Sequence, residues 1–423
     1  MPTIFILLAY YWLITFSIIG YGILFNNFFL KNTNNIGFIG IYGIFSLTLI
    51  SYLINFFLPL TESINVVILS VGLINFLVSI KRDLIRKNID LLLIVFTILI
   101  LFILTAKNHD DFSYYHFPYI HLLTENSNMI GLGNFNHGFR THSSIFYLTA
   151  LFNLPFSNFY LFNLSPVFFM GFANIILYKR ILSYLDQTKT AYLLYLSLFS
   201  LIFINIFFYR LGEHGTDRSA MILIFILTIE LLNLINQKRN VDPNYFLRPI
   251  ILTTLIISLK TFYILYCLLF IPVVWYFKRK NISLMFFFQK SVSYVCLGMI
   301  LSLLTVNFFN SGCLLYPVKF TCFESFSWSI PLNEVEAMNN WYQQWAKAGA
   351  NPNFRVENPE VYIDNFNWVS NWVNMYFFNK VSDFLLGLVF LSLVMWFIFF
   401  SKKTQIMEKP QFWLIYSIFI FLT

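Results

Sequence analysis

The stretch KNHDDFSYYHFPYIHLLTENSNMIGLGNFNHGFRTHSSIFY, residues 107–147, is a polar interruption in a chain that is 58% hydrophobic and only 11% charged. Most of the histidines of the protein lie in it, at positions His109, His116, His121, His137 and His142. The sixth histidine, His214, lies in a second, shorter polar break. Groups that can act as acids or bases are therefore gathered into a few gaps between apolar runs, which form a hydrophobic frame around them.

The composition of the whole chain excludes a soluble protein. A soluble chain of 423 residues would form two or three domains, but 53 Phe, 25 Tyr and a mean hydropathy of +0.71 fit no soluble class. Runs of roughly 20 apolar residues, the length that crosses a bilayer, recur along the chain. We therefore predict an all-α polytopic membrane protein whose surroundings are the lipid bilayer.

The net charge of +8 does not indicate a nucleic-acid-binding protein. The basic residues are spread over short loops between apolar runs rather than over one face. Loops of this kind are retained on the cytoplasmic side of a membrane. The most basic of them is KRDLIRK at 81–87, which we expect in the cytoplasm.

The apolar runs predict a single transmembrane domain over residues 1–423 with about 11–12 spans. They lie at about 3–25, 36–60, 63–80, 89–106, 158–178, 190–209, 219–236, 249–277, 290–309, 381–400 and 411–423, where 249–277 counts as one span or as two. With the basic loop in the cytoplasm, the segments 107–157, 210–218 and 310–378 share the opposite face. We expect 107–157 and 310–378 to be the two large outer, periplasmic loops. The last run reaches Thr423 without a polar end, which is typical of a piece of a longer chain.

Residues 249–277 have a basic residue at each end, Arg248 before them and Lys278 after them. Both ends are therefore expected in the cytoplasm, although the run is too short for two full spans. A hairpin of two short or broken helices solves this, with Lys260 at its tip in a cavity, because irregular backbone at membrane depth must line water or be buried in protein. The alternative is one long tilted helix with a snorkelling lysine.

The segment 310–378 is rich in Trp, Pro, Asn and Gly and is expected to be an ordered cap rather than a flexible linker. Cys313 and Cys322 flank a short stretch near its start. On a face outside the cytoplasm such a pair can be oxidised, so we predict a disulfide between them.

The paired acids Asp110 and Asp111 lie near the start of the polar stretch. If 111–123 is helical, Asp111, Tyr115 and Tyr119 lie on one stripe along the membrane surface. The helix dipole also favours an acidic residue at a helix start. An Asp in this place can be a helix cap without any catalytic role. We favour this interpretation for Asp110 and a functional role for Asp111.

Further polar groups share the predicted outer face: Arg140, Arg210, His214, Asp217 and Arg218. Lys260 lies near the middle of its apolar run, where a buried cation is costly unless it meets an anion. Acids are scarce within the spans, which argues against a carboxylate partner for Lys260. An anionic ligand such as a phosphate is therefore expected there.

The order of several short motifs resembles a known group of enzymes. The motifs are Asp-x-x-x-Tyr within DFSYYHFPYI, then GLGNFNHGFRTHSSIFYLTALF, GEHGTDRSA, SLK and NSGCLLYP, within residues 89–320. This arrangement resembles the GT-C superfamily of polyprenyl-phosphate-dependent glycosyltransferases, and more closely an uncharacterised bacterial branch associated with surface polysaccharides. The resemblance implies a GT-C-like helical bundle whose active site lies in the outer loops.

The resemblance implies an inverting sugar transfer from a polyprenyl-phosphate or polyprenyl-diphosphate donor to a glycan or lipid acceptor of the cell envelope. The implied place is the periplasmic face of the bacterial inner membrane. Asp111, or else Asp110, would act as the general base on the acceptor hydroxyl. The cations expected to stabilise the leaving phosphate are Arg140, Arg210, Arg218 and Lys260. The residues expected in other substrate-binding roles are His116, Tyr115, His214 and Asp217.

Two features differ from the better-known members of that superfamily. Four predicted spans, instead of one, precede the acidic loop. Phe112 follows Asp111 where those members have an Asp-Glu pair. The choice between Asp110 and Asp111 as the base therefore stays open.

Two other functions stay open beside glycosyl transfer. A flippase or other transporter of lipid-linked oligosaccharides needs charged residues along a path through the bundle, but apart from Lys260 the spans have almost none. An O-antigen ligase or polymerase relies on outer-loop arginines and a histidine, which Arg210 and His214 can supply.

No cofactor is expected, with a divalent metal as the local alternative. The possible ligands are His109, Asp110, Asp111, His116 and His121. None of them has the HExxH-type spacing that identifies a zinc site from sequence.

Overall fold

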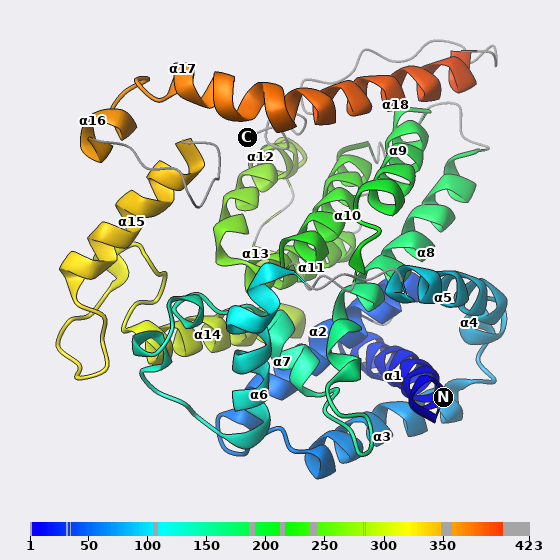
Figure 1. The fold of residues 1–423 in the computed structure, drawn as a ribbon. Helices are drawn as coiled ribbons and strands as arrows, with labels where there is room; N and C mark the ends of the chain where they lie inside the picture. Colours follow the sequence, from blue (N-terminus) through cyan, green and yellow to red (C-terminus); the bar gives the residue numbers. More distant parts are fainter. Residues whose placement is uncertain are drawn as a thin grey trace. The chain divides into compact units, whose positions relative to one another are not determined.

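The computed structural model describes residues 2–30, 33, 35–104, 109–185, 191–211, 216–236, 243–281, 283, 285–347 and 358–400. Helices dominate this part of the chain, in which the β-type pairing is an isolated bridge between Cys313 and Cys322. The all-α prediction is therefore confirmed (Figure 1). His214 and the predicted span 411–423 lie outside the described residues.

Seven helices of the described chain are long and apolar enough to cross a membrane. They are Ile4–Leu30, Ile36–Asn55, Glu62–Ser79, Tyr160–Leu185, Thr216–Ile235, Thr261–Arg279 and Ser291–Ser311. A bent pair, Val369–Phe378 with Ser382–Leu393, would add an eighth, and three shorter apolar helices are Ile89–Leu104, Tyr192–Phe207 and Leu247–Leu259. The protein is therefore a multi-pass membrane protein that lies in a lipid bilayer. The predicted number of 11–12 spans stays a prediction.

The described residues form two compact units. The first contains the residues up to Met129 and those from His142 to Val306, and the second contains Ile130–Thr141 and the residues from Asn307 onward. The single transmembrane domain and the sidedness of the two large loops stay predictions.

The helices of the first unit, in chain order, are α1 (Pro2–Phe25), η1 (Asn26–Leu30), α2 (Ile36–Asn55), α3 (Glu62–Ser79), α4 (Asp83–Arg86), α5 (Ile89–Leu104), η2 (Phe112–His116), α6 (Phe117–Glu125), α7 (Ser144–Ala150), η5 (Tyr160–Asn163), α8 (Ser165–Leu185), α9 (Ala191–Phe207), α10 (Thr216–Asn236), η8 (Pro243–Phe246), α11 (Leu247–Leu259), η9 (Thr261–Leu269), α12 (Phe270–Arg279) and α13 (Met285–Phe288). Helix α14 (Ser291–Ser311) continues into the second unit. The other helices of the second unit are η3 (Leu132–Asn134), η4 (His137–Phe139), η10 (Lys319–Thr321), α15 (Leu332–Lys347), α16 (Pro359–Ile363), α17 (Val369–Trp372), η11 (Val373–Val381) and α18 (Ser382–Phe400).

Glycines bring helices α1, α2 and α3 into close contact. A Cβ atom on Gly20 would lie 1.8 Å from the carbonyl oxygen of Gly72, and one on Gly43 would lie 1.8 Å from that of Ile18. No larger side chain fits at either crossing. Small residues of this kind let helix backbones approach each other inside a membrane, where van der Waals packing rather than the hydrophobic effect holds helices together.

The chain folds back at Lys260, as the hairpin prediction requires. Lys260 has extended backbone (φ −154°, ψ 115°) between the end of α11 and the start of η9. The ring of Phe246, just before α11, lies 5.4 Å from that of Phe270 and 5.1 Å from that of Phe277, both in α12. The start of α11 therefore lies beside α12, so the chain reverses direction between them. This excludes a single long tilted helix.

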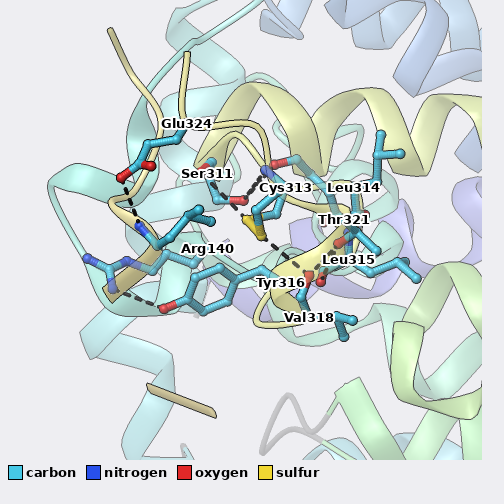
Figure 2. Close-up of a disulfide and its surroundings, with 12 residues drawn as sticks. Arg140, Ser311, Cys313, Leu314, Leu315, Tyr316, Val318, Thr321 and Glu324 are labelled. Atoms are coloured by element: carbon cyan, nitrogen blue, oxygen red, sulfur yellow. Dashed lines mark hydrogen bonds between the residues drawn. A yellow bond between two sulfur atoms is a disulfide. The ribbon is translucent and has the colours of Figure 1, made fainter. Parts of the chain in front are cut away.

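In the second unit a disulfide between Cys313 and Cys322 closes the loop that follows α14 (Figure 2). The backbone N–H of Leu314 donates to the carbonyl of Thr321 at 3.0 Å, so the two sides of the loop are also hydrogen-bonded. Cys313 packs in a small buried core with Tyr316 and two further apolar residues, Ile330 and Val335. The start of the predicted outer cap is therefore ordered, with its own apolar core.

Candidate functional site

Asp111 lies at the start of a helix in the first unit. The π-helix η2 follows it directly, and α6 continues the helix. Inserted π-helical turns are rare and occur frequently at functional sites. The hydroxyl of Tyr115 donates to Asp111 Oδ2 at 3.4 Å, so the predicted pairing of these two side chains on one stripe is present.

His109 forms the other neighbour of Asp111. The backbone N–H of Asp111 donates to His109 Nδ1 at 3.1 Å, and the same nitrogen lies 3.5 Å from Asp111 Oδ2. The side chain of Asp111 is 43% exposed, so its carboxylate is oriented by neighbours and still open to a ligand. Asp110 is exposed.

His116, at the end of the same π-helix, is 2% exposed. Neither of its ring nitrogens has a hydrogen-bond partner in the described chain. The rings of Tyr115 and Phe146 lie 4.4 and 5.1 Å from it. Burial, together with the electrostatic influence of His109 and Lys260, lowers the pKa of His116 to about 3. The imidazole is therefore neutral at physiological pH, and it can donate a hydrogen bond to a hydroxyl or accept one from it.

Lys260 pairs with Asp217, a residue of the first turn of α10. Lys260 Nζ lies 2.5 Å from Asp217 Oδ1, with the side chains 45% and 42% exposed. The expectation that scarce acids leave Lys260 without a carboxylate partner is therefore wrong. The expectation failed because it counted only acids within the spans. Asp217 lies in the first turn of α10, at the end of a span, and Lys260 at the hairpin tip reaches it.

Helix α7 holds the end of α11 that presents Lys260. The hydroxyl of Ser143 donates to the carbonyl of Leu259 at 2.5 Å, and the hydroxyls of Ser144 and Ser258 lie 2.9 Å apart. These contacts join the segment that follows the polar stretch to the hairpin tip. His116 and Lys260 are also close enough to interact electrostatically. His116, Lys260 and Asp217 are therefore close together, and Asp111 lies on the same short helix as His116.

Arg218 lies beside Asp217 and holds the end of the preceding segment. Its Nη1 donates to the backbone carbonyl of Arg210 at 2.5 Å. Two of the predicted phosphate-binding arginines are therefore in contact, through the side chain of Arg218 and the backbone of Arg210. His214, which lies between them in sequence, is outside the described residues.

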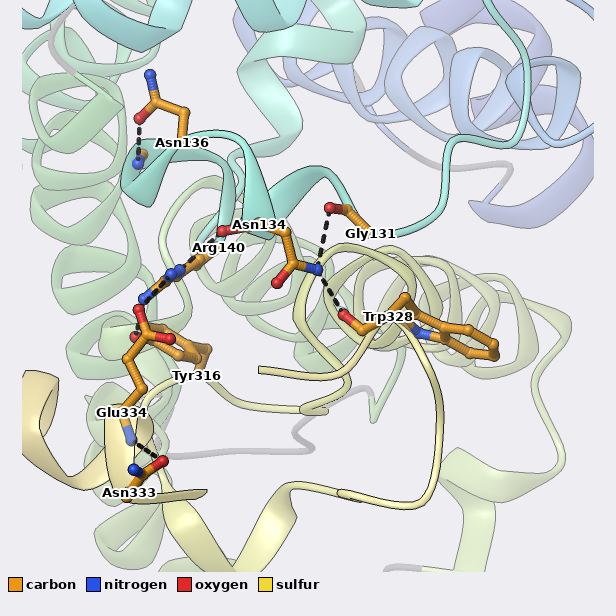
Figure 3. Close-up of polar contacts among 10 residues, drawn as sticks. Gly131, Asn134, Asn136, Arg140, Tyr316, Trp328, Asn333 and Glu334 are labelled. Carbon is orange, nitrogen blue, oxygen red and sulfur yellow. Dashed lines mark hydrogen bonds and ion pairs between the residues drawn. The ribbon is translucent and has the colours of Figure 1, made fainter. Parts of the chain in front are cut away.

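Arg140 belongs to the second unit and is 6% exposed there. Its Nε donates to the carbonyl of Gly133 at 2.9 Å, its Nη1 to the hydroxyl of Tyr316 at 3.1 Å and its Nη2 to Glu334 Oε1 at 2.7 Å (Figure 3). Nearby, the side-chain amide of Asn134 donates to the carbonyl of Trp328 at 2.8 Å. Nη1 and Nη2 of Arg140 thus join 130–141 to the rest of the second unit, while Nε holds Gly133 within that segment.

Two further histidines of the polar stretch have side-chain partners in the protein. His121 Nε2 lies 3.4 Å from Glu125 Oε1, and His142 Nε2 lies 2.8 Å from the hydroxyl of Tyr52. Across the described ranges no group of three or more His, Cys, Asp or Glu side chains is placed to hold a metal ion.

The sequence prediction missed one charged cluster in the first unit. Glu230 of α10 is buried and forms ion pairs with Arg180 of α8 and Arg248 of α11. The sequence does contain a signal for this cluster, because Glu230 is an acidic residue within the apolar run 219–236.

The fold defines a multi-pass helical membrane protein, and the partly exposed residues Asp111, Lys260 and Asp217 are candidates for its functional site. By its sequence, the chain belongs to the family described as "Domain of unknown function (DUF8201)", which it matches over residues 4–423. No curated protein and no solved structure matches it.

Proposed function

We propose that this protein is a membrane glycosyltransferase. In this proposal a sugar moves from a polyprenyl-phosphate or polyprenyl-diphosphate donor to a glycan or lipid acceptor of the cell envelope. The reaction takes place at the periplasmic face of the bacterial inner membrane. The observation that carries the proposal is the half-exposed carboxylate of Asp111, oriented by Tyr115 and His109, on the same short helix as His116, which interacts with the cation Lys260.

Asp111 is the general base in this mechanism. Its carboxylate takes the proton of the acceptor hydroxyl while the hydroxyl oxygen forms a bond to the anomeric carbon of the sugar. The bond from that carbon to the phosphate oxygen breaks, and the lipid phosphate leaves with the electron pair. Attack from the face opposite to the leaving group inverts the configuration at the anomeric carbon.

Lys260 is the cation for the leaving phosphate. Its pairing with Asp217 holds the ammonium group in place while no phosphate is bound. Both side chains are nearly half exposed, so a phosphate can compete with Asp217 for this charge at modest cost. Arg218, the residue that follows Asp217 in α10, adds positive charge close to this pair. Cations aimed at developing negative charge contribute strongly to catalysis.

The experiment is sugar transfer by the purified protein in proteoliposomes that contain a polyprenyl-phosphate sugar. Asp111→Asn is expected to reduce kcat by about 10²–10⁴-fold, because it removes the base but keeps the shape of the side chain. Asp110→Asn is the matched control and should transfer at nearly the wild-type rate. Full activity of a folded Asp111→Asn protein would overturn the assignment.

Transport of a lipid-linked oligosaccharide is the second candidate, and one observation favours it. Charged groups lie near both ends of α10, with Asp217 at its start and Glu230 six residues before its end. Charges along a bundle are typical of a substrate path. Movement of a labelled lipid-linked sugar between leaflets, with its sugar–phosphate bond intact, would select transport over transfer.

A further inference from the structure

A second cluster of charges lies at the start of α11, at the other end of that helix from Lys260. Glu230 of α10 forms ion pairs with Arg180 of α8 and, at 4.0 Å, with Arg248 of α11. The side chains of Arg180 and Arg248 are 18% and 14% exposed, and that of Glu230 is 5% exposed. Two positive charges thus share one negative charge, which leaves the cluster with a net charge of +1.

Two buried tyrosine hydroxyls border this cluster. Tyr42 of α2 is fully buried and interacts electrostatically with Arg248 and Glu230, and Tyr184 of α8 is 4% exposed and interacts with Arg180. Neither hydroxyl makes a hydrogen bond of good geometry with the described chain, although Tyr42 lies close to Thr33 and Arg248 and Tyr184 lies close to Arg180. Nε of Arg180 also has no partner there. Buried polar groups without a partner are costly and need an explanation.

The cluster has more donors than acceptors. Guanidinium groups only donate hydrogen bonds and tyrosine hydroxyls donate readily, while the carboxylate of Glu230 is the acceptor to which both arginines turn. A negatively charged group with several acceptor oxygens would satisfy these donors. Phosphate has both properties, and arginine pairs with it through parallel hydrogen bonds.

The depth of the cluster suits a phosphate at the edge of a bilayer. Arg180 lies five residues before the end of α8 and Glu230 six residues before the end of α10, or about 8–9 Å along each helix axis. The loops that follow these helices are basic in sequence and are expected in the cytoplasm. Basic pockets between membrane helices on this side bind anionic head groups.

We propose that Arg180, Arg248, Tyr42 and Tyr184 form a binding site for a phosphate group at the cytoplasmic side of the membrane. The phosphate comes from the head group of an anionic lipid or from free phosphate. This site does not depend on the proposed sugar transfer. If the ion pairs only held α8, α10 and α11 together, the two tyrosine hydroxyls would have no function. Removing the hydroxyls therefore distinguishes a structural cluster from a phosphate site.

The experiment compares the melting temperature of the full-length protein in three media. These are vesicles of phosphatidylcholine, vesicles in which a quarter of the lipid is phosphatidylglycerol, and phosphatidylcholine vesicles with inorganic phosphate at matched ionic strength. The wild-type melting temperature is expected to rise with phosphatidylglycerol, with phosphate or with both. A rise with the lipid alone identifies a head group as the source, and a rise with phosphate identifies the free anion.

The decisive variant is Tyr42→Phe combined with Tyr184→Phe. It should melt close to the wild type in pure phosphatidylcholine, because neither hydroxyl makes a hydrogen bond of good geometry to the protein. It should bind the phosphate about tenfold more weakly and lose most of the rise. The control is Tyr21→Phe, whose hydroxyl donates to the carbonyl of Ile68 at 2.8 Å. It should melt lower in every medium and keep the full rise. A double variant that keeps the full rise, or a wild type without any rise, overturns the proposal.

Discussion

Asp111 and His116 lie on one short helix but have opposite surroundings. Asp111 is close to half exposed and has a charged form that water and Tyr115 can stabilise. His116 is buried among aromatic rings and stays neutral. A neutral imidazole forms no ion pair, and the imidazole beside the Asp111 carboxylate is that of His109, 3.5 Å away. The two residues therefore suit a reaction in which one group accepts a proton and the other binds an uncharged hydroxyl.

The buried state of His116 predicts a pH dependence of stability. Its pKa is about 3 in the folded protein against an ordinary value of 6.5. Between these values the unfolded chain binds a proton that the folded protein does not bind, so acid favours unfolding. We expect the free energy of unfolding to fall by about 1.4 kcal/mol per pH unit below pH 6.5 from this residue alone, and not to depend on it above pH 6.5.

Thermal unfolding of the wild type and of His116→Asn at pH 7.5, 6 and 5 measures this dependence. The variant cannot take up the proton, so its melting temperature should fall less between pH 6 and 5 than that of the wild type. Equal slopes for the two proteins would show that His116 is not buried in its neutral form.

The hairpin of α11, η9 and α12 is the element that carries the second half of the site. Its break at Lys260 was predicted from charge alone, because Arg248 and Lys278 require both ends on one side of the membrane. The pairing of Lys260 with Asp217 was not predicted, because it joins residues that are far apart in sequence. The ion pairs of Glu230 were not predicted for the same reason. Local patterns such as Asp111 with Tyr115 could be read from spacing, whereas contacts between distant helices needed the fold.

Lys260→Ala tests the role of the hairpin tip. The ion pair with Asp217 is nearly half exposed, so its loss should change the free energy of unfolding by less than about 1 kcal/mol. Binding of a polyprenyl-phosphate sugar should weaken by about tenfold, because a charged hydrogen bond to the phosphate is lost. The control is Asp217→Asn, which frees Lys260 and should leave donor binding unchanged or tighter. Wild-type donor binding by Lys260→Ala would exclude this lysine from the site.

Arg140 was predicted to bind substrate, but its contacts indicate a role in folding. Arg140→Ala removes three donors and leaves the mostly buried hydroxyl of Tyr316 without its partner. We expect the second unit to lose about 2–3 kcal/mol of stability, seen as faster proteolysis of residues 307–347. Lys319→Ala, which breaks the exposed pair with Glu336, is the control and should cost under about 1 kcal/mol. Unchanged proteolysis together with weaker donor binding would restore the substrate-binding role.

At the scale of the whole molecule, composition alone predicted a helical multi-pass membrane protein, because runs of apolar residues long enough to cross a bilayer have few other solutions. The grouping of the described residues into two units could not be read from composition, because it depends on which loops pack together. Within the first unit the acidic segment at Asp111 and the hairpin tip at Lys260 lie near each other, as a shared outer face requires. Their sidedness in a membrane stays a prediction.

The most direct test of the account is an experimental structure of the protein with a non-hydrolysable polyprenyl-phosphate sugar bound. The account predicts a phosphate oxygen within about 4 Å of Lys260 Nζ and the sugar ring between this phosphate and the carboxylate of Asp111. A phosphate bound away from Lys260, or a sugar that Asp111 cannot reach, would contradict it.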